Sequence, residues 1–544
     1  MALVGCRSSS DAPAPVAPAL PEATAPPSLV AELSLGNPKE TWRRLRVLGG
    51  DRAQALPSSL PVLLATSLSL PASAAGALDE ALPMVGVVLS RPDRPEPDVV
   101  LGMHVVSGAE LVASLSLGDS AKFRRVELAP RVVRLVSAPG AAEFDGALGV
   151  SGNYLLLATN ADALKDSARF VAEKVSKRAR TRPGLTMTAS QSVLGGLLAR
   201  RLREAWQAQR GRLSAQARAE REARGRPPDF ADPAALVAGA DGTVESWLSV
   251  LESSRELSVS LTPDADRLRT EVRLTPADDG AARTLQRELV VGSTAPLLQL
   301  PASARAALLL RGDARPGDGA LGAAVASLFG ERLSAAHTAR LSRALDAFAQ
   351  SRRGATVFGL VPSPSPALVV RCELSDGAAF TSSLSDLVSL IELPALSGWL
   401  SATLGKPSVE RSRARSGAER AKIRFARSAA SGSSLPKSFG LTWEAKGDTG
   451  VIVVSQDASL EPAAFGDGPV LGSHAWLARD PAAPPEQTAF ALYLDARLLA
   501  PGGPDEAPLW LSFGKKDEQA TLSLDVSAPA LSALARGFAL DRSP

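Results

Sequence analysis

The residues best suited to acid–base or metal chemistry are three histidines, and their spacing favours neither role. His104, His337 and His474 lie far apart in the sequence, and no pair has the spacing of a metal-binding motif. No Gly-x-Ser-x-Gly sequence marks a nucleophile on a strand-to-helix turn. We therefore expect no catalytic residues, no metal and no cofactor, although residue counts alone leave an enzyme of unknown type open.

Two further motif matches are weak. Gly317–Gly322 spells Gly-x-Gly-x-x-Gly, but 311–316 separate it from the preceding strand, whereas a dinucleotide fold turns immediately off the strand. We interpret it as a flexible loop. Ser434–Lys437 matches Ser-x-x-Lys, yet the companion motifs of the penicillin-binding enzymes are missing.

The strongest functional feature is a basic helix predicted over 189–225. Its periodicity gathers an apolar stripe consisting of Leu194, Leu197, Leu198, Leu202, Trp206 and Leu213. Arginines occupy most other positions, and the candidate contacts to an anionic surface are Arg200, Arg201, Arg203, Arg210, Arg212, Arg218 and Arg221. Such a helix either packs its stripe on a sheet as core or lies on anionic lipid or an acidic partner.

Charge is concentrated in two segments. The chain has 60 Lys and Arg against 57 Asp and Glu, for a net charge of +3. Residues 174–226 have 14 Lys and Arg against three Glu, and 406–437 have nine against two, so the remainder is acidic. The expected partners of the basic helix are anionic lipid, a glycan or an acidic protein. Nucleic acid is not expected, because no aromatic stacking platform or recognised module accompanies the charge.

The N-terminus suggests a compartment. Leu3-Val4-Gly5-Cys6 resembles the lipobox of bacterial lipoproteins, and an Ala/Pro-rich stretch that cannot pack follows it through Pro27. The resemblance implies lipid attachment at Cys6 and a periplasmic or outer-membrane lipoprotein in the envelope of a Gram-negative bacterium. Five residues are too few for a signal peptide, so we expect a truncated precursor; the alternative is a cytoplasmic protein.

Four blocks recur in the same order and indicate an internal repeat. Met84–Ser90 aligns with Val357–Ser363, and Gly108–Leu115 with Gly377–Leu384. Leu155–Asn160 aligns with Val451–Gln456, and Leu257–Leu261 with Leu509–Phe513.

Each repeat is expected to open with a strand, at Val62–Ala65 and Ala306–Leu310, and to close with an amphipathic hairpin. The predicted fold class is α+β, with two related halves, each a mainly antiparallel sheet with helices on one face. We expect a tether over 1–30, a first half over 31–295 with a basic helical insertion at about 176–228, and a second half over 296–544. Cys372 shares one face of an expected strand with apolar residues, so we interpret it as a core residue.

The run Gly152–Val171 resembles bacterial envelope proteins of unknown function with duplicated α+β modules. The resemblance implies a non-enzymatic, lipid-anchored protein with a binding or scaffolding role, held at the membrane by its lipid. Two alternatives stay open, namely an enzyme with a site between the halves and a carrier that holds a lipid against the sheet. A deep apolar groove without convergent polar groups would favour the carrier; a pocket with a nucleophile and a base would favour the enzyme.

Overall fold

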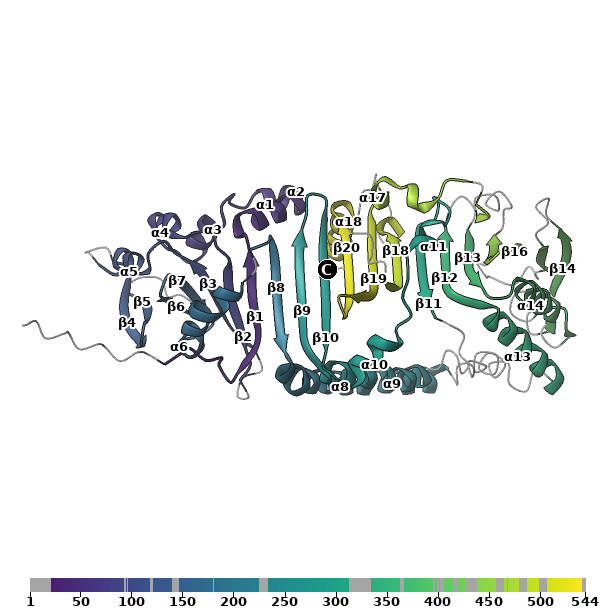
Figure 1. Ribbon diagram of the computed structural model, residues 1–544, viewed down its shortest axis with the longest axis horizontal. Helices are drawn as coiled ribbons and strands as arrows, with labels where there is room; N and C mark the ends of the chain where they lie inside the picture. Colours follow the sequence, from purple (N-terminus) through teal and green to yellow (C-terminus); the bar gives the residue numbers. More distant parts are fainter. Residues whose placement is uncertain are drawn as a thin grey trace, which may run out of the picture.

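The computed structural model contains a single antiparallel sheet along the long axis of the molecule (Figure 1). It describes residues 21–540 except 92–93, 95, 118–120, 139–145, 180, 225–232, 313–333, 363–365, 395–396, 399–400, 402–405, 414–418, 427–437, 456–463, 467, 479–486 and 499–505.

The sheet is best followed from its two edges toward the middle. From one edge the order is β4 (Phe123–Ala129), β5 (Val132–Ser137), β6 (Ala147–Ser151), β7 (Tyr154–Ala158), β3 (Asp98–His104), β2 (Met84–Leu89), β1 (Leu29–Gly36), β8 (Gly184–Ser190), β9 (Ser254–Pro263) and β10 (Arg267–Pro276). From the other edge it is β14 (Lys406–Arg413), β15 (Glu419–Ala426), β16 (Ser438–Lys446), β17 (Thr449–Ser455), β13 (Ala367–Leu374), β12 (Arg352–Val361), β11 (Ala306–Arg311), β18 (Thr488–Asp495), β19 (Pro508–Lys516) and β20 (Gln519–Ser527).

The strands of the two series follow the same order. Each strand of the second series corresponds to the strand of the first series whose label is lower by ten. The aligned sequence blocks fall on corresponding elements: β2 and β12, β7 and β17, β9 and β19, and helices α5 (Gly108–Ser116) and α14 (Gly377–Leu390). Both helices begin at a side-chain cap, since Ser107 accepts from the amide of Glu110 and Asp376 from that of Ala379. This common order is what an internal repeat predicts.

The seam between the series is the pairing of β10 with β20, which runs from Arg267↔Ser527 to Leu274↔Ala520. Two contacts flank it in a related way. Helix α18 (Ala528–Leu540) follows β20. The backbone amide of its first residue, Ala528, donates a hydrogen bond to the carbonyl of Asp266, which lies between β9 and β10. Helix α10 (Ala281–Glu288) follows β10. The side-chain amide of its Gln286 donates a hydrogen bond to the carbonyl of Glu518, which lies between β19 and β20.

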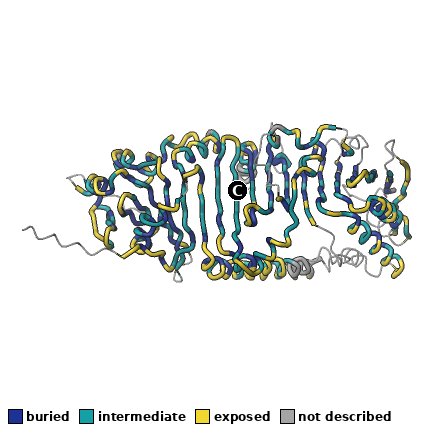
Figure 2. The backbone as a smooth tube through the Cα atoms, viewed as in Figure 1, coloured by how far each residue is buried: buried dark blue, intermediate teal, exposed yellow. Residues whose placement is uncertain are grey.

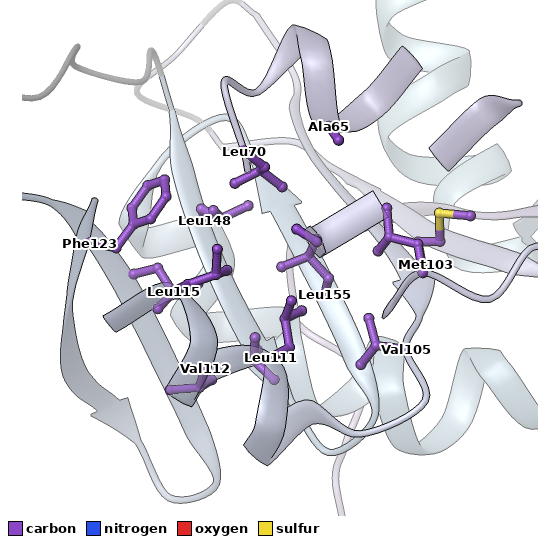
Figure 3. Close-up of a cluster of buried hydrophobic side chains, with 14 residues drawn as sticks. Ala65, Leu70, Met103, Val105, Leu111, Val112, Leu115, Phe123, Leu148 and Leu155 are labelled. Carbon is purple, nitrogen blue, oxygen red and sulfur yellow. The ribbon is translucent and has the colours of Figure 1, made fainter. Parts of the chain in front are cut away.

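Helices cover both faces of the first outer part, which we define as β2–β7. One face packs on α3 (Leu60–Ser67), α4 (Ala72–Ala77) and α5 around Leu111 and Leu155 (Figure 3). The other packs on α6 (Ala161–Phe170) and the π-helix η1 (Val171–Val175), followed by α7 (Ser176–Arg178). The prediction placed helices on one face only. The second layer forms because these strands carry apolar residues at consecutive positions, so both faces need burial.

The second outer part, β12–β17, is covered in the same manner. On one face α13 (Ala335–Gln350) and α14 pack around Phe380, together with the buried Cys372. On the other face lie α11 (Ala295–Leu298), the 3-10 helix η6 (Leu471–Ser473) and α17 (Ala475–Ala478). Cys372 is 2% exposed on β13, as expected for a core residue.

Two local predictions were wrong. The expected strand Val62–Ala65 is part of helix α3, and the first half opens instead with β1. A short apolar run fits either element, and Pro61 at the start of the helix is the signal that we missed. The basic insertion also begins later than 176, because Gly184–Ser190 forms β8.

The remaining helices lie near the strand ends (Figure 1). After β1 come α1 (Pro38–Leu48) and α2 (Gly50–Gln54). Between β8 and β9 the chain forms the π-helix η2 (Val193–Leu198), α8 (Ala199–Arg224) and α9 (Pro233–Glu252). In the second half the corresponding link contains the 3-10 helix η7 (Ala496–Leu498). The α8–α9 hairpin therefore distinguishes the two strand series.

Candidate functional site: an open apolar sheet face

The strands on either side of the seam present one apolar face. Residues paired across antiparallel strands project to the same side, so rows can be followed through the pairings. One row reads Leu33, Met187, Val259, Val272, Leu522, Phe513, Phe490 and Leu310. A second reads Leu35, Leu185, Leu261, Thr270, Leu524, Leu511, Leu492, Leu308 and Phe358.

A third row completes the surface, which we call the central apolar face. It runs through Leu268, Val526, Leu509, Leu494, Ala306, Leu360 and Leu368. The three rows cross strands of both halves without interruption at the seam. With a strand spacing of about 4.8 Å, the eight intervals from β1 to β12 extend over roughly 40 Å.

Much of this face is open to solvent. Its most exposed members lie on five different strands: Leu185 at 41%, Leu310 at 42%, Leu360 at 44%, and Leu368 and Leu522 at 38% each. Figure 2 shows the strands around the seam mainly half-buried, whereas blue buried segments are frequent in the outer parts. A contiguous apolar surface of this extent marks an interaction site in soluble proteins.

Helices meet the face at its borders. Helix α18 packs against Leu509, Leu524 and Val526. On the hairpin, the ring of Trp247 on α9 lies edge-on to Phe513, with 6.2 Å between ring centroids. Trp247 keeps 47% of its surface exposed. The hairpin thus touches the face by a residue that is itself apolar and accessible.

The reverse side of β1, β8, β9 and β10 is polar. Its rows include Glu32, Thr188, Ser258 and Arg273, and then Ser34, Thr186, Ser260 and Glu271. Arg269 on β10 pairs with Asp525 on β20 at 2.7 Å across the seam. A pocket of about 350 Å³ lies on this side beside α7, lined by Glu32, Arg178, Thr186, Thr188 and Ser190 among others. These four strands are therefore amphipathic.

The predicted basic helix forms α8, and two of its candidate arginines are occupied inside the hairpin. Arg203 pairs with Glu252 at 3.0 Å and with Glu245 at 3.4 Å. Arg210 pairs with Asp241 at 3.1 Å, and the same carboxylate accepts a hydrogen bond from the indole of Trp206. These pairs raise the pKa of Arg203 through its hydrogen bonds to Glu252 and Glu245. Their role is to join α8 to α9.

The other candidates differ. Arg200, Arg201, Arg212 and Arg218 are exposed, and no ion pair to them is found among the described residues. Arg221 lies on α8, but its side chain is outside the described residues. Cys6 also lies outside them, as do Gly317–Gly322 and Ser434–Lys437.

The leucine stripe changes character along the helix. Leu194 is completely buried with Val193 and Ala189, and Leu198 packs beside them. Leu202, one turn further, is 42% exposed. Trp206 and Leu213, further along, are half-buried. The stripe is therefore core at its start and only partly buried beyond, a mixture of the two interpretations.

Two of the histidines lie beside carboxylates. His104 lies 3.3 Å from Asp79, and His474 contacts Glu506 at 3.0 Å and the carbonyl of Ala302 at 2.9 Å. No group of three potential metal ligands occurs in the part of the chain that the structure describes. The junction between the two strand series is continuous β-pairing.

Sequence reasoning missed the central apolar face, although its signal was present. The strict alternation in Leu257–Leu261 and Leu268–Leu274 predicted half-buried strands. Alternation fixes which residues share a face, but it does not say whether another layer covers that face.

Among the helices that the structure describes, none combines the length and the apolar composition that a membrane-spanning helix needs.

Comparisons with known proteins add little. No protein-family model matches the chain, and no curated protein does. Among solved structures, the chain has a weak similarity to crystal form III of TP0453, with 12% identity and a TM-score of 0.21. The match covers 44% of this chain and 97% of the other. At this TM-score the similarity supports no conclusion about fold or function.

Proposed function

We propose that the protein is a non-enzymatic, lipid-anchored envelope protein that holds the acyl chains of a lipid on the central apolar face. One observation carries the proposal: aliphatic and aromatic side chains from both strand series form unbroken rows across the seam, and members on five strands are at least 38% exposed. Among the alternatives from the sequence, this observation favours the carrier.

The chemistry of the face suits an acyl chain. Along the three rows Thr270 is the only side chain with a hydrogen-bonding group, so a ligand gains most if it also lacks such groups. Burial of each methylene contributes about 0.8 kcal/mol. The roughly 40 Å length exceeds the about 15 Å that one chain spans in half of a 30 Å hydrocarbon core.

Charge complementarity favours an anionic lipid as the occupant. The hairpin that touches the face through Trp247 also carries Arg200, Arg201, Arg212 and Arg218 without described acidic partners. A phospholipid combines apolar chains with an anionic headgroup. A second copy of this chain would offer an apolar surface, but its hairpin would carry the same exposed arginines.

Direct lipid binding tests the proposal. The full-length protein is titrated with a fluorescent phosphatidylglycerol below its aggregation threshold, and lipid that copurifies is identified by mass spectrometry. Changing Leu185, Leu310 and Leu522 together to Asn should weaken binding at least tenfold. The matched control changes Val106 and Leu117 to Asn, since both are 69% exposed and lie in the first outer part.

Two outcomes would contradict the proposal. Equal binding by the triple variant and the control would show that the lipid sits elsewhere. A stable dimer in native mass spectrometry, dissociated by the triple variant, would identify a second copy as the occupant.

The anchor has its own test. Labelled palmitate should enter the full-length protein in a bacterial host, and it should not enter a Cys6→Ser variant. Equal labelling of both proteins would remove Cys6 as the attachment site.

A further inference from the structure

Helix α8 separates its arginines into two sets. Arg203 and Arg210 turn toward α9 and are neutralised by Glu245, Glu252 and Asp241. The second set, Arg200, Arg201, Arg212 and Arg218, is exposed and has no ion-pair partner among the described residues. We call this second set the outer arginines.

Helical geometry explains the division for Arg201 and Arg212. At 3.6 residues per turn, Arg201 and Arg212 are about three turns apart and project from the same side. Arg201 and Arg203 are about 200° apart around the axis, so the side that carries Arg201 faces away from α9. Arg200 and Arg218 project about 60° from Arg203, and their exposure without a described ion pair places them in the same set as Arg201 and Arg212.

We propose that the outer arginines dock the α8–α9 hairpin on the surface of a bilayer that contains anionic phospholipid. Exposed charges contribute little to folding, whereas each Arg near such a surface strengthens association roughly fivefold. Leu202 lies next to Arg201 and is 42% exposed, so an apolar side chain is available for the interface as well.

The position of the hairpin gives this docking a direction. The hairpin runs along the strand ends (Figure 1), and Trp247 brings it into contact with Phe513 of the central apolar face. Docking through α8 would place that border of the face nearest the bilayer. The inference does not require the face to hold lipid, because the outer arginines alone carry it.

The test is vesicle co-sedimentation of the full chain carrying Cys6→Ser, so that no acyl anchor contributes. Vesicles of phosphatidylcholine with phosphatidylglycerol are compared with vesicles of phosphatidylcholine alone. Changing the four outer arginines to Gln should reduce partitioning onto the anionic vesicles about 100-fold or more. Raising the salt to about 1 M should have a similar effect, because the Debye length falls to about 3 Å.

A matched variant separates a specific surface from net charge. Arg124, Arg125, Arg343 and Arg353 are exposed arginines of the outer parts, and no ion pair to them is found among the described residues. Their joint change to Gln removes the same four charges and should alter partitioning by less than about threefold.

Three results would overturn the inference: equal losses in both quadruple variants, equal binding to the neutral vesicles, or binding to polyglutamate without binding to vesicles. The last would indicate an acidic protein partner. The soluble phosphatidylglycerol titration distinguishes this failure from failure of the central-face proposal, because only the latter depends on Leu185, Leu310 and Leu522.

Discussion

The outer parts and the strands at the seam use the same sheet differently. In the first outer part both faces are buried, as the adjacent residues Leu155 at 6% and Leu156 at 0% exposure show, since they belong to the clusters on opposite faces. At the seam one face is polar and the other is apolar but open, with Leu185 and Leu522 about two-fifths exposed. The difference lies in the sequences, since β7 has consecutive leucines whereas β9 alternates Leu or Val with Ser.

The comparison indicates which strands stabilise the fold and which strands are suited to binding. Consecutive apolar residues require cover on both sides, and α3–α6 supply it in the first outer part. Alternating strands keep their hydrogen-bond ladder without a second layer. An open apolar face contributes little to stability in the absence of a ligand, so its composition points to binding.

Two adjacent residues on β11 allow the most direct test of this difference between the regions. Leu309 is fully buried toward η6 and α11, whereas Leu310 faces the open side. Leu309→Ala should cost about 3–5 kcal/mol of unfolding free energy, because it removes buried methyl groups and leaves a cavity. Urea titration of the full chain measures the loss. A loss below about 1 kcal/mol would show that the outer core does not carry the stability.

A buried ion cluster at the border of the two regions should have the next largest effect. Asp495 at the end of β18 is 0% exposed and accepts from Arg305 at 2.9 Å and from Arg497. Burial tends to raise the pKa of Asp495, but hydrogen bonds and charge from Arg497 outweigh it, so the pKa lies below its ordinary value. Asp495→Asn should cost about 3 kcal/mol at pH 7, because it leaves two guanidinium groups without a counter-charge.

The pH dependence provides the control for that substitution. With a folded pKa below the unfolded one, the contribution of Asp495 is complete above about pH 4. It is lost as the pH falls through the folded value. The gap in unfolding free energy between the wild type and Asp495→Asn should therefore narrow at low pH. A gap that stays constant from pH 7 to the acid limit would exclude the charge as its cause.

Part of the fold could be predicted because its signals are local. Asn160 caps α6 by accepting from the amide of Ala163 at 2.8 Å, and Asn is a preferred residue at that position. The hairpin Ser254–Pro276 was expected from its alternation and turn residues. Helix α9 was missed, because two glycines in its sequence, Gly239 and Gly242, weaken its helical signal. The role of α9 became clear only from the structure, in which its acidic side chains form ion pairs with Arg203 and Arg210.

The candidate site was less predictable because it depends on long-range pairing. Leu310 and Leu522 belong to different strands, and the alignment of their rows depends on the register of β11, β18, β19 and β20. No local pattern fixes that register. The sequence identified the outer arginines as exposed candidates, but only the structure separates them from the two that α9 neutralises.

The contact between hairpin and face predicts a smaller effect. Trp247 and Phe513 form an edge-to-face pair. A double-mutant cycle with Trp247→Ala and Phe513→Ala should give a coupling of about 0.5–1.5 kcal/mol in unfolding free energy. A coupling within about 0.3 kcal/mol of zero would mean that the hairpin does not rest on the second half in solution.

The smallest effect on stability is expected for Leu310, the neighbour of Leu309 on the same strand. Leu310→Ala should change the unfolding free energy by less than about 1 kcal/mol, because the side chain is 42% exposed and deletion leaves no enclosed cavity. In the presence of bound phosphatidylglycerol the same substitution should cost more, since ligand binding stabilises only the folded state that retains the site. The measurement is the urea midpoint of both proteins with and without lipid. If Leu310→Ala cost as much as Leu309→Ala without ligand, the face would be covered in solution, and the division between a stabilising outer part and a binding central face would have to be abandoned.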